Sequence, residues 1–148
     1  MLSLNFPRYH FRFKCSENKQ QIFDIIRKKF VSLQPEEWVR QHVIHFLNID
    51  KNYPVSLINV EKTLSLNGLR KRYDIVVFNT DGSIHILVEC KSPNITISQA
   101  VFDQIARYNL KMKAEYLMVT NGLDHFYCKM NYEGEKYSFL KQIPDFSR

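Results

Sequence analysis

The chain has 148 residues, of which 45% are hydrophobic, and it contains only four glycines and five prolines. This composition excludes a disordered, collagen-like or linker-rich chain, and the length favours one domain with a buried core. The formal net charge of +6 and the pI near 9.2 are compatible with a polyanionic partner, of which nucleic acid is the commonest.

Two weakly patterned segments come first in the chain. Residues 1–15 end in alternating aromatic and basic residues, which predicts an extended arm or an edge strand. Residues 18–30 have the apolar spacing of a short amphipathic helix, with Ile22, Ile25, Ile26 and Phe30 on one face. We therefore expect residues 1–34 to form an N-terminal arm and short helix, and residues 35–148 to form the main domain.

Pro35 begins the next predicted helix, PEEWVRQHVIHFLNI. Proline suits the first helical turn, and Glu36 and Glu37 suit the positive end of the helix dipole. The apolar stripe of this helix consists of Val39, Val43, Phe46 and Leu47.

The remainder of the chain alternates between strand and helix signals. Asn67-Gly68 and Thr80-Asp81-Gly82 are turn signals between the first strands. The predicted elements are strands at 55–66, 73–79 and 83–90, a helix at 97–113, a strand at 115–120, and a hairpin of 126–130 with 136–140. This order predicts a single α/β domain with a central mixed sheet flanked by helices.

The three cysteines, Cys15, Cys90 and Cys128, are far apart and have no metal-binding spacing with the five histidines. Free thiols in a reducing cytoplasm are the expected state. No apolar run approaches the roughly 18 residues that a membrane helix needs, and the first residues lack a signal-peptide core. We therefore expect a cytoplasmic protein with no membrane partner.

One end of the predicted sheet collects charged residues. Asp74 begins one strand and Glu89 ends the next, and the turn at 80–82 makes these strands antiparallel neighbours, so the two carboxylates should meet. Lys91 lies two residues beyond Glu89 and should point to the same face, whereas Cys90 should point into the opposite core.

These residue types favour phosphodiester hydrolysis. Two carboxylates form a hard oxygen site for Mg²⁺ or Mn²⁺, and the backbone carbonyl of Cys90 is a candidate additional ligand. Lys91 would then lie beside metal-bound water, where it orients or polarises the water or neutralises charge that develops on the phosphate.

The pattern of Asp74, fourteen residues, then Glu89-x-Lys91 resembles the PD-(D/E)XK nuclease superfamily. The helix "PEEWVRQHVIHFL" resembles the first helix of that fold, which commonly carries a metal-site glutamate. Glu36 shares the apolar stripe and should face the core, while Glu37 lies about 100° away. The resemblance therefore implies Glu36 as a metal ligand, with Glu37 as the second choice.

Downstream, "DQIARYN" carries Gln104 and Tyr108, which are four residues apart and share a helix face. In the branch of the superfamily that resembles RecB, and in N-terminal domains of type I restriction R subunits, such a pair lies beside the metal site and DNA. The resemblance implies that Gln104 and Tyr108 position the lysine or a backbone phosphate.

The more specific resemblance is to small stand-alone proteins of the family named after the N-terminal domain of the type I restriction R subunit. It covers about residues 35–130 in five ordered blocks: "PEEWVRQ", "GLRKRYDIVVFN", "VECKSP", "FDQIARYN" and "LMVTNGLDHFYCKM". Tyr73 replaces the family proline, at a position that varies widely. No GxxxxGK[ST] motif occurs in the chain, so ATP-driven translocation would require a separate helicase or motor subunit.

Each charged residue also has an ordinary explanation. Asp74 would pair with the basic residues at 70–72, and Glu89 would form a weak surface pair with Lys91. The basic residues at 70–72 are equally expected to contact phosphates or to lie in a solvated loop. The whole set of residues favours a site instead.

The leading expectation is a Mg²⁺-dependent nuclease that acts on DNA. The alternatives are a DNA-binding or assembly module with an idle site and a phosphohydrolase that acts on RNA or nucleotides. A motor or specificity subunit is an expected partner, and a homodimer fits double-strand cleavage, which usually needs two active sites.

Overall fold

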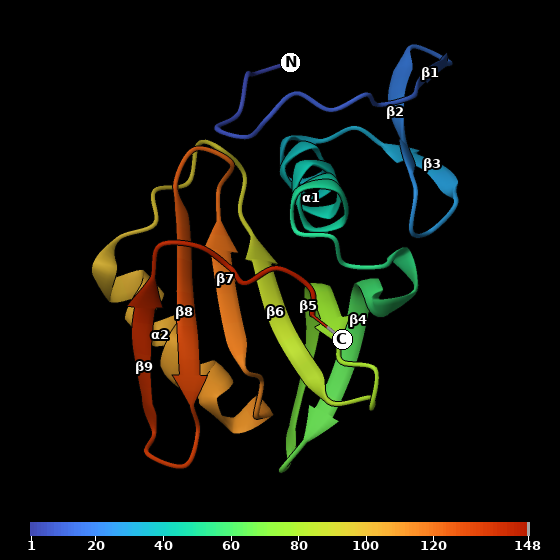
Figure 1. Cartoon of the computed structure of the whole chain (residues 1–148). Helices are drawn as coiled ribbons and strands as arrows, with labels where there is room; N and C mark the ends of the chain where they lie inside the picture. Colours follow the sequence, from blue (N-terminus) through green and yellow to red (C-terminus); the bar gives the residue numbers. More distant parts are fainter. Residues whose placement is uncertain (148) are drawn as a thin grey trace.

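A six-stranded sheet forms the centre of the molecule in the computed structural model, which describes residues 1–147 (Figure 1). Its strands are β4 (Ile58–Leu66), β5 (Leu69–Phe78), β6 (Ile84–Cys90), β7 (Tyr116–Thr120), β8 (His125–Asn131) and β9 (Lys136–Leu140). They lie in the sheet in chain order. Each predicted strand therefore has a counterpart in the structure.

All neighbouring strands of this sheet are antiparallel except β6 and β7, which are parallel from the pair Ile86–Tyr116 to the pair Cys90–Thr120. Parallel neighbours need a crossover connection. Helix α2 (Gln99–Asn109), which Ser98 caps by accepting the N–H of Val101, makes this crossover. The prediction of a mixed sheet in an α/β domain is confirmed.

The two faces of the sheet are covered by different helices. On one face, Ile75 and Val88 pack in a buried cluster with Val39 and Val43 of helix α1 (Pro35–His45). On the other face, the adjacent strand residues Val76 and Leu87 pack against Phe102 and Ala106 of α2. The period-2 alternation of strand side chains produces this division.

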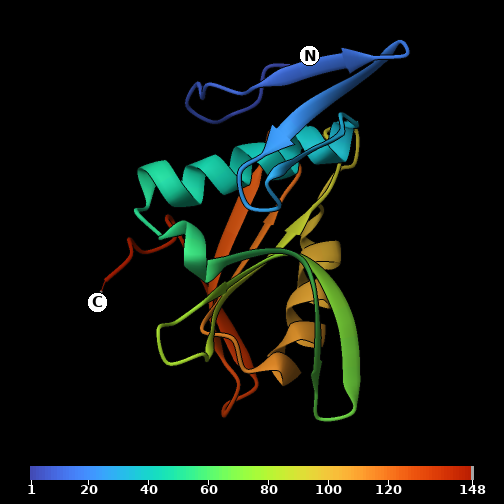
Figure 2. The same ribbon diagram turned by 90° about the vertical axis from the view of Figure 1, so that its right-hand side faces the viewer.

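A second, three-stranded sheet covers the side of α1 that faces away from the central sheet (Figure 2). Its strands are β1 (Phe13–Ser16), β2 (Lys19–Asp24) and β3 (Lys29–Ser32), all antiparallel. The predicted helix at 18–30 is therefore wrong. The Asp24 carboxylate accepts the N–H groups of Ile26 and Arg27, both at 2.7 Å, and so stabilises a turn in the middle of the segment.

Four boundaries also differ from the prediction. The first helix continues past His45 as a π-helical turn, Phe46–Asp50, and the predicted strand at 55–66 begins with a 3-10 turn, Val55–Leu57. Strand β5 begins at Leu69, so the bases at 70–72 lie in a strand and not in a loop. After α2 the chain adds a 3-10 turn, Leu110–Met112, within the predicted helix.

The division of the chain at residue 35 stays a prediction, and residue 148 lies outside the described residues. Within residues 1–147, neither helix combines the length and the apolar character of a membrane span.

Candidate active site

Asp74 is held in place at the point where α1 crosses the sheet. One carboxylate oxygen, Oδ2, accepts the backbone N–H of Cys90 at 2.7 Å, and the other, Oδ1, accepts Nη2 of Arg40 at 2.8 Å. The first bond comes from the neighbouring strand β6 and the second from α1. Both oxygens are therefore fixed by elements that belong to the core.

Glu36 lies beside this pair at the start of α1, and its side chain is 48% exposed. Its Oε1 accepts Nη2 of Arg40 at 3.2 Å. Burial raises the pKa of Glu36, and the negative charge of Asp74 raises it further, while Arg40 and Lys91 act in the opposite direction. Two carboxylates and one lysine are thus within electrostatic reach of one another.

The expectation that Glu36 faces the core is wrong, because Glu37 is the buried glutamate of the pair, at 8% exposure. Its Oε1 accepts Nη2 of Arg27 and Nη1 of Arg40, both at 2.9 Å, and its Oε2 accepts Nε2 of Gln41 at 3.2 Å. The three-stranded sheet covers this face of α1, and the helical pattern gave no sign of that cover.

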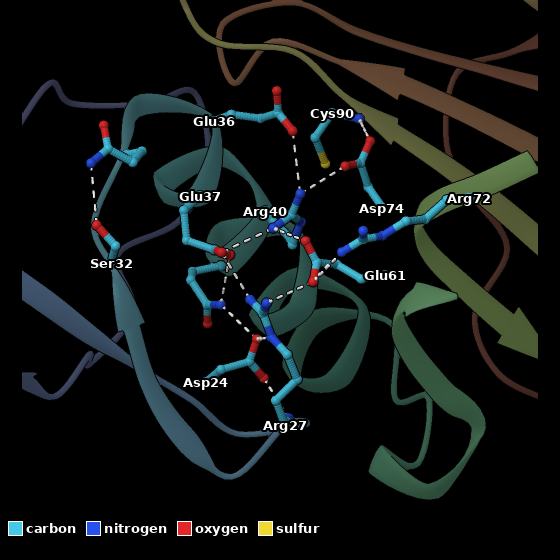
Figure 3. Close-up of polar contacts among 12 residues, drawn as sticks. Asp24, Arg27, Ser32, Glu36, Glu37, Arg40, Glu61, Arg72, Asp74 and Cys90 are labelled. Carbon is cyan, nitrogen blue, oxygen red and sulfur yellow. Dashed lines mark hydrogen bonds and ion pairs between the residues drawn. The ribbon is translucent and has the colours of Figure 1, made fainter. Parts of the chain in front are cut away.

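Arg27, Arg40 and the acidic residues around them form one continuous network, which Figure 3 shows. Arg27 also pairs with Asp24 at 2.7 Å, and Arg72 pairs with Glu61 at 2.6 Å. Because buried charges must be paired, this network fixes the three-stranded sheet, α1 and the central sheet relative to one another.

Glu89, at the end of β6, is 7% exposed and pairs with Nζ of Lys71 on β5. The Lys71 ammonium also lies 5.0 Å from the ring centroids of Tyr73 and Tyr108. Cys90 is buried toward α1, opposite Glu89 but beside Asp74 and Arg40, so it does not face away from Asp74 as predicted (Figure 3). Tyr108 is thereby connected to Glu89 through Lys71.

Lys91 follows directly after β6, and its backbone N–H donates to the carbonyl of Thr120 at 2.8 Å. Burial lowers the pKa of Lys71, the positive charge of Lys91 lowers it further, and the charge of Asp74 partly offsets both. Asp74, Lys71 and Lys91 are therefore electrostatic neighbours. The structure groups Asp74 with Glu36 through Arg40 on the α1 side, and Glu89 with Tyr108 through Lys71 on the α2 side.

Gln104 lies one turn before Tyr108 on the exposed face of α2, as the i, i+4 spacing predicts. No hydrogen bond joins its side chain to the candidate residues within the part of the chain that the structure describes. The role of Gln104 in the site stays a prediction.

The residue types fit a hard divalent cation, since Asp74, Glu89 and Glu36 offer carboxylate oxygens. Within residues 1–147, no group of three or more His, Cys, Asp or Glu side chains is arranged to hold a metal ion. Arg40 instead pairs with Asp74 and Glu36, and Lys71 pairs with Glu89. An ion that binds here would therefore compete with Arg40 for Asp74 and with Lys71 for Glu89.

Sequence reasoning missed the role of Arg40, although a signal for it existed. Arg40 lies four residues after Glu36 and three after Glu37, which are the spacings for ion pairs on a helix. Lys71 was recognised only as one of three consecutive bases. The prediction began this strand at residue 73, whereas β5 begins at Leu69. The strand therefore includes Lys71, whose side chain pairs with Glu89 of β6.

The fold and this arrangement define an α/β domain with carboxylates and a lysine at one end of its central sheet. Residues 35–144 match the family described as "Type I restriction enzyme R protein N terminus (HSDR_N)". The chain belongs to this family. No curated protein matches the chain.

Proposed function

We propose that this protein is a metal-dependent nuclease of the PD-(D/E)XK type that hydrolyses DNA phosphodiester bonds as part of a restriction system. One observation carries the proposal: Asp74 and Glu89 lie at the same end of the adjacent strands β5 and β6, and Lys91 follows, in a chain of the R-protein N-terminal family. The family membership supports the restriction context, and the residues support the chemistry.

Four groups would hold Mg²⁺ or Mn²⁺: the carboxylates of Asp74, Glu89 and Glu36 and the backbone carbonyl of Cys90. When bound, such an ion lowers the pKa of water and stabilises charge on phosphoryl oxygens. The Cys90 N–H bond keeps Asp74 oriented, so that Asp74 changes its partner from Arg40 without changing its place on the strand.

Lys91 has the role of orienting the attacking water and neutralising charge that develops on the phosphate. Tyr108 is 43% exposed and lies beside Lys71, so its hydroxyl is available to a backbone phosphate. Gln104, one turn away on the same helix, extends this contact surface. Lys91, Tyr108 and Gln104 thus bind or position the water and the phosphate. The carboxylates provide the negative charge that would hold the ion.

The partners in this proposal are DNA and the other subunits of a restriction system. Translocation along DNA would come from a separate motor subunit, since the sequence has no GxxxxGK[ST] motif. Cleavage of both strands would use two copies of the site, which favours a homodimer on DNA. The cytoplasm is the compartment in which we propose that it acts.

A second candidate function has its own support. The carboxylates of Asp74 and Glu89 already pair with Arg40 and Lys71, which suits a DNA-binding or assembly module with an idle nuclease site. Such a module binds DNA without cutting it under any divalent ion.

Supercoiled plasmid incubated with the purified protein in Mg²⁺ or Mn²⁺ distinguishes the two functions. The nuclease proposal predicts nicked or linear plasmid with the wild type, and loss of at least 100-fold in rate with Lys91→Ala. Lys129→Ala, an exposed lysine on β8, is the matched control and should cut at the wild-type rate. Cleavage that persists in EDTA or in Lys91→Ala contradicts the mechanism, and binding without cleavage under every ion favours the module.

A further inference from the structure

The positive charge of this protein is concentrated in its first 34 residues. They hold seven of the 21 Lys and Arg residues but only two of the 15 Asp and Glu residues, and so carry +5 of the net +6. These residues precede the segment that matches the family, which begins at residue 35. The family match therefore assigns no role to this charge.

Only one of the seven bases is neutralised within the fold. Arg27 pairs with Asp24, Glu37 and Glu61. The other six are exposed and make no ion pair within residues 1–147: Arg8, Arg12, Lys14, Lys19, Lys28 and Lys29. Because Asp24 is buried, Glu17 is the one exposed acidic side chain of the segment.

Three of these bases share the outer face of the three-stranded sheet. The inner face packs on α1, where the Phe13 ring lies 6.2 Å from that of Trp38 and Ile22 is fully buried. Phe13 pairs with Ile22 on the inner face, so the next pair, Lys14 with Gln21, lies on the outer face. Two residues further along β1, the pair of Ser16 with Lys19 lies on the outer face as well. Arg12, one residue before β1, continues the same face. No carboxylate occupies an outer-face position.

Aromatic rings support two of these cations. The Arg12 guanidinium lies 4.5 Å from the centroid of Phe23, and Nζ of Lys14 lies 5.6 Å from that of Phe30. Phe23 and Phe30 are opposite each other on β2 and β3. Stacking restricts the side chains while their charges stay in water, so the charges are available to a partner at a small entropic cost.

The position of this face relative to the candidate active site is favourable. The β1–β2 hairpin projects past α1 on the side where α1 begins, which is the end that carries Glu36 (Figure 2). The hairpin and Glu36 therefore lie at the same end of α1.

We infer that the outer face of the three-stranded sheet, defined by Arg12, Lys14 and Lys19, binds the phosphate backbone of duplex DNA. Exposed, unpaired cations on a surface without carboxylates are complementary to a phosphate backbone and read no sequence. The choice of DNA as the polyanion depends on the proposed function, whereas the location of the surface follows from the charges alone.

Fluorescence anisotropy of a labelled 30-base-pair duplex, titrated with the full chain in EDTA at 50–200 mM NaCl, measures this binding without cleavage. The test variant is Arg12→Gln/Lys14→Gln/Lys19→Gln. The matched control, Lys129→Gln/Lys136→Gln/Lys141→Gln, removes the same charge from exposed positions at the opposite end of the chain. The test variant should lower the slope of log K against log [salt] by about 2 to 3 and weaken binding at least tenfold, and the control should change binding less than threefold.

A circular-dichroism melt establishes whether the triple variant is folded. If it is not, Lys14→Gln/Lys19→Gln replaces it, with an expected slope change of about 2. Equal losses in test and control variants, or no loss in either, overturn the inference. Tighter binding to duplex RNA, or sheet-dependent binding to anionic lipid vesicles in place of DNA, also overturns it.

The inference and the nuclease proposal fail separately. Sheet-dependent DNA binding in EDTA with no cleavage in Mg²⁺ contradicts the nuclease alone. Plasmid cleavage by the wild type with binding that ignores the sheet variant contradicts this surface alone.

Discussion

The guanidinium of Arg40 on α1 lies 2.8 Å from the carboxylate of Asp74 on β5, and the Arg40 side chain is 9% exposed. The same guanidinium contacts Glu37 at 2.9 Å and Glu36 at 3.2 Å. One nearly buried cation is therefore shared by three carboxylates where the first helix meets the central sheet. The electrostatics of the candidate site depend on this residue.

Arg40→Ala should cost about 3 kcal/mol of unfolding free energy, because it leaves Glu37 and Asp74 largely buried without their cation. Urea unfolding followed by tryptophan fluorescence measures this change. Arg107→Ala removes an exposed arginine of α2 and should change stability by no more than about 0.5 kcal/mol. Equal effects of the two substitutions would show that the network around Arg40 contributes nothing to the fold.

The protein should lose stability between pH 7.5 and 5.5 because of two histidines of α1. Burial lowers the pKa of His42 and of His45, and the charge of His42 lowers that of His45 further. In the unfolded chain the pKa of each histidine is near 6.5. Above that pH both histidines are neutral in the folded and the unfolded protein, so they do not change stability with pH. Below it the unfolded state takes up protons first, so stability falls as the pH falls, by at most about 1.4 kcal/mol per pH unit for each histidine.

His45→Leu isolates this effect, because neither ring nitrogen of His45 has a hydrogen-bond partner in the described structure. The substitution removes a buried polar ring without breaking a bond, so stability at pH 7.5 should be unchanged or higher. The loss between pH 7.5 and 5.5, measured by urea midpoints, should shrink relative to the wild type. A pH dependence identical to the wild type contradicts the assignment.

Gly122→Ala tests the packing of the N-terminal arm against α1. Gly122 has φ +88°, and an added Cβ would lie 2.9 Å from Leu4 and 3.1 Å from Val39. Gly82 also has φ +88°, with open space around the corresponding Cβ position. Both substitutions suffer backbone strain, but Gly122→Ala should cost about 1–3 kcal/mol more, because it overpacks the core. Equal melting temperatures for the two variants would contradict this close approach.

Removal of divalent ions should leave the fold intact, since Arg40 and Lys71 already pair with the carboxylates. EDTA should not change the melting temperature of the metal-free protein. Mg²⁺ at ten times its dissociation constant should add about 1.4 kcal/mol, and Asp74→Asn should abolish this gain. Unfolding in EDTA alone would show that the ion pairs do not replace the metal.

The central strand, and the end of the sheet at which Asp74 and Glu89 lie, were predictable because local signals agree there. The turn at 80–82 and the apolar run into Glu89 specify a hairpin, and the hairpin brings the two carboxylates to one end. The helix beginning at Pro35 was predictable for the same reason.

The N-terminal sheet was not predictable from period alone. Ile22 and Phe30 fit a helical spacing, but Ile22 lies on the inner face of a strand and Phe30 on the outer face of the next. The turn that the Asp24 side chain stabilises makes this segment two strands and not one helix. The spacing of the apolar residues gives no sign of that turn. The same missing sheet explains the choice of Glu36 over Glu37, because α1 is covered on two sides.

In the proposed function, Asp74, Glu89 and Glu36 hold a divalent ion for hydrolysis. Anomalous diffraction from a crystal soaked in Mn²⁺ tests it most directly. The expected result is a manganese peak bounded by Asp74 and Glu89, with Glu36 nearby and with Arg40 and Lys71 displaced. A soaked crystal with no peak at these carboxylates, and with the Arg40–Asp74 and Lys71–Glu89 pairs intact, would contradict it.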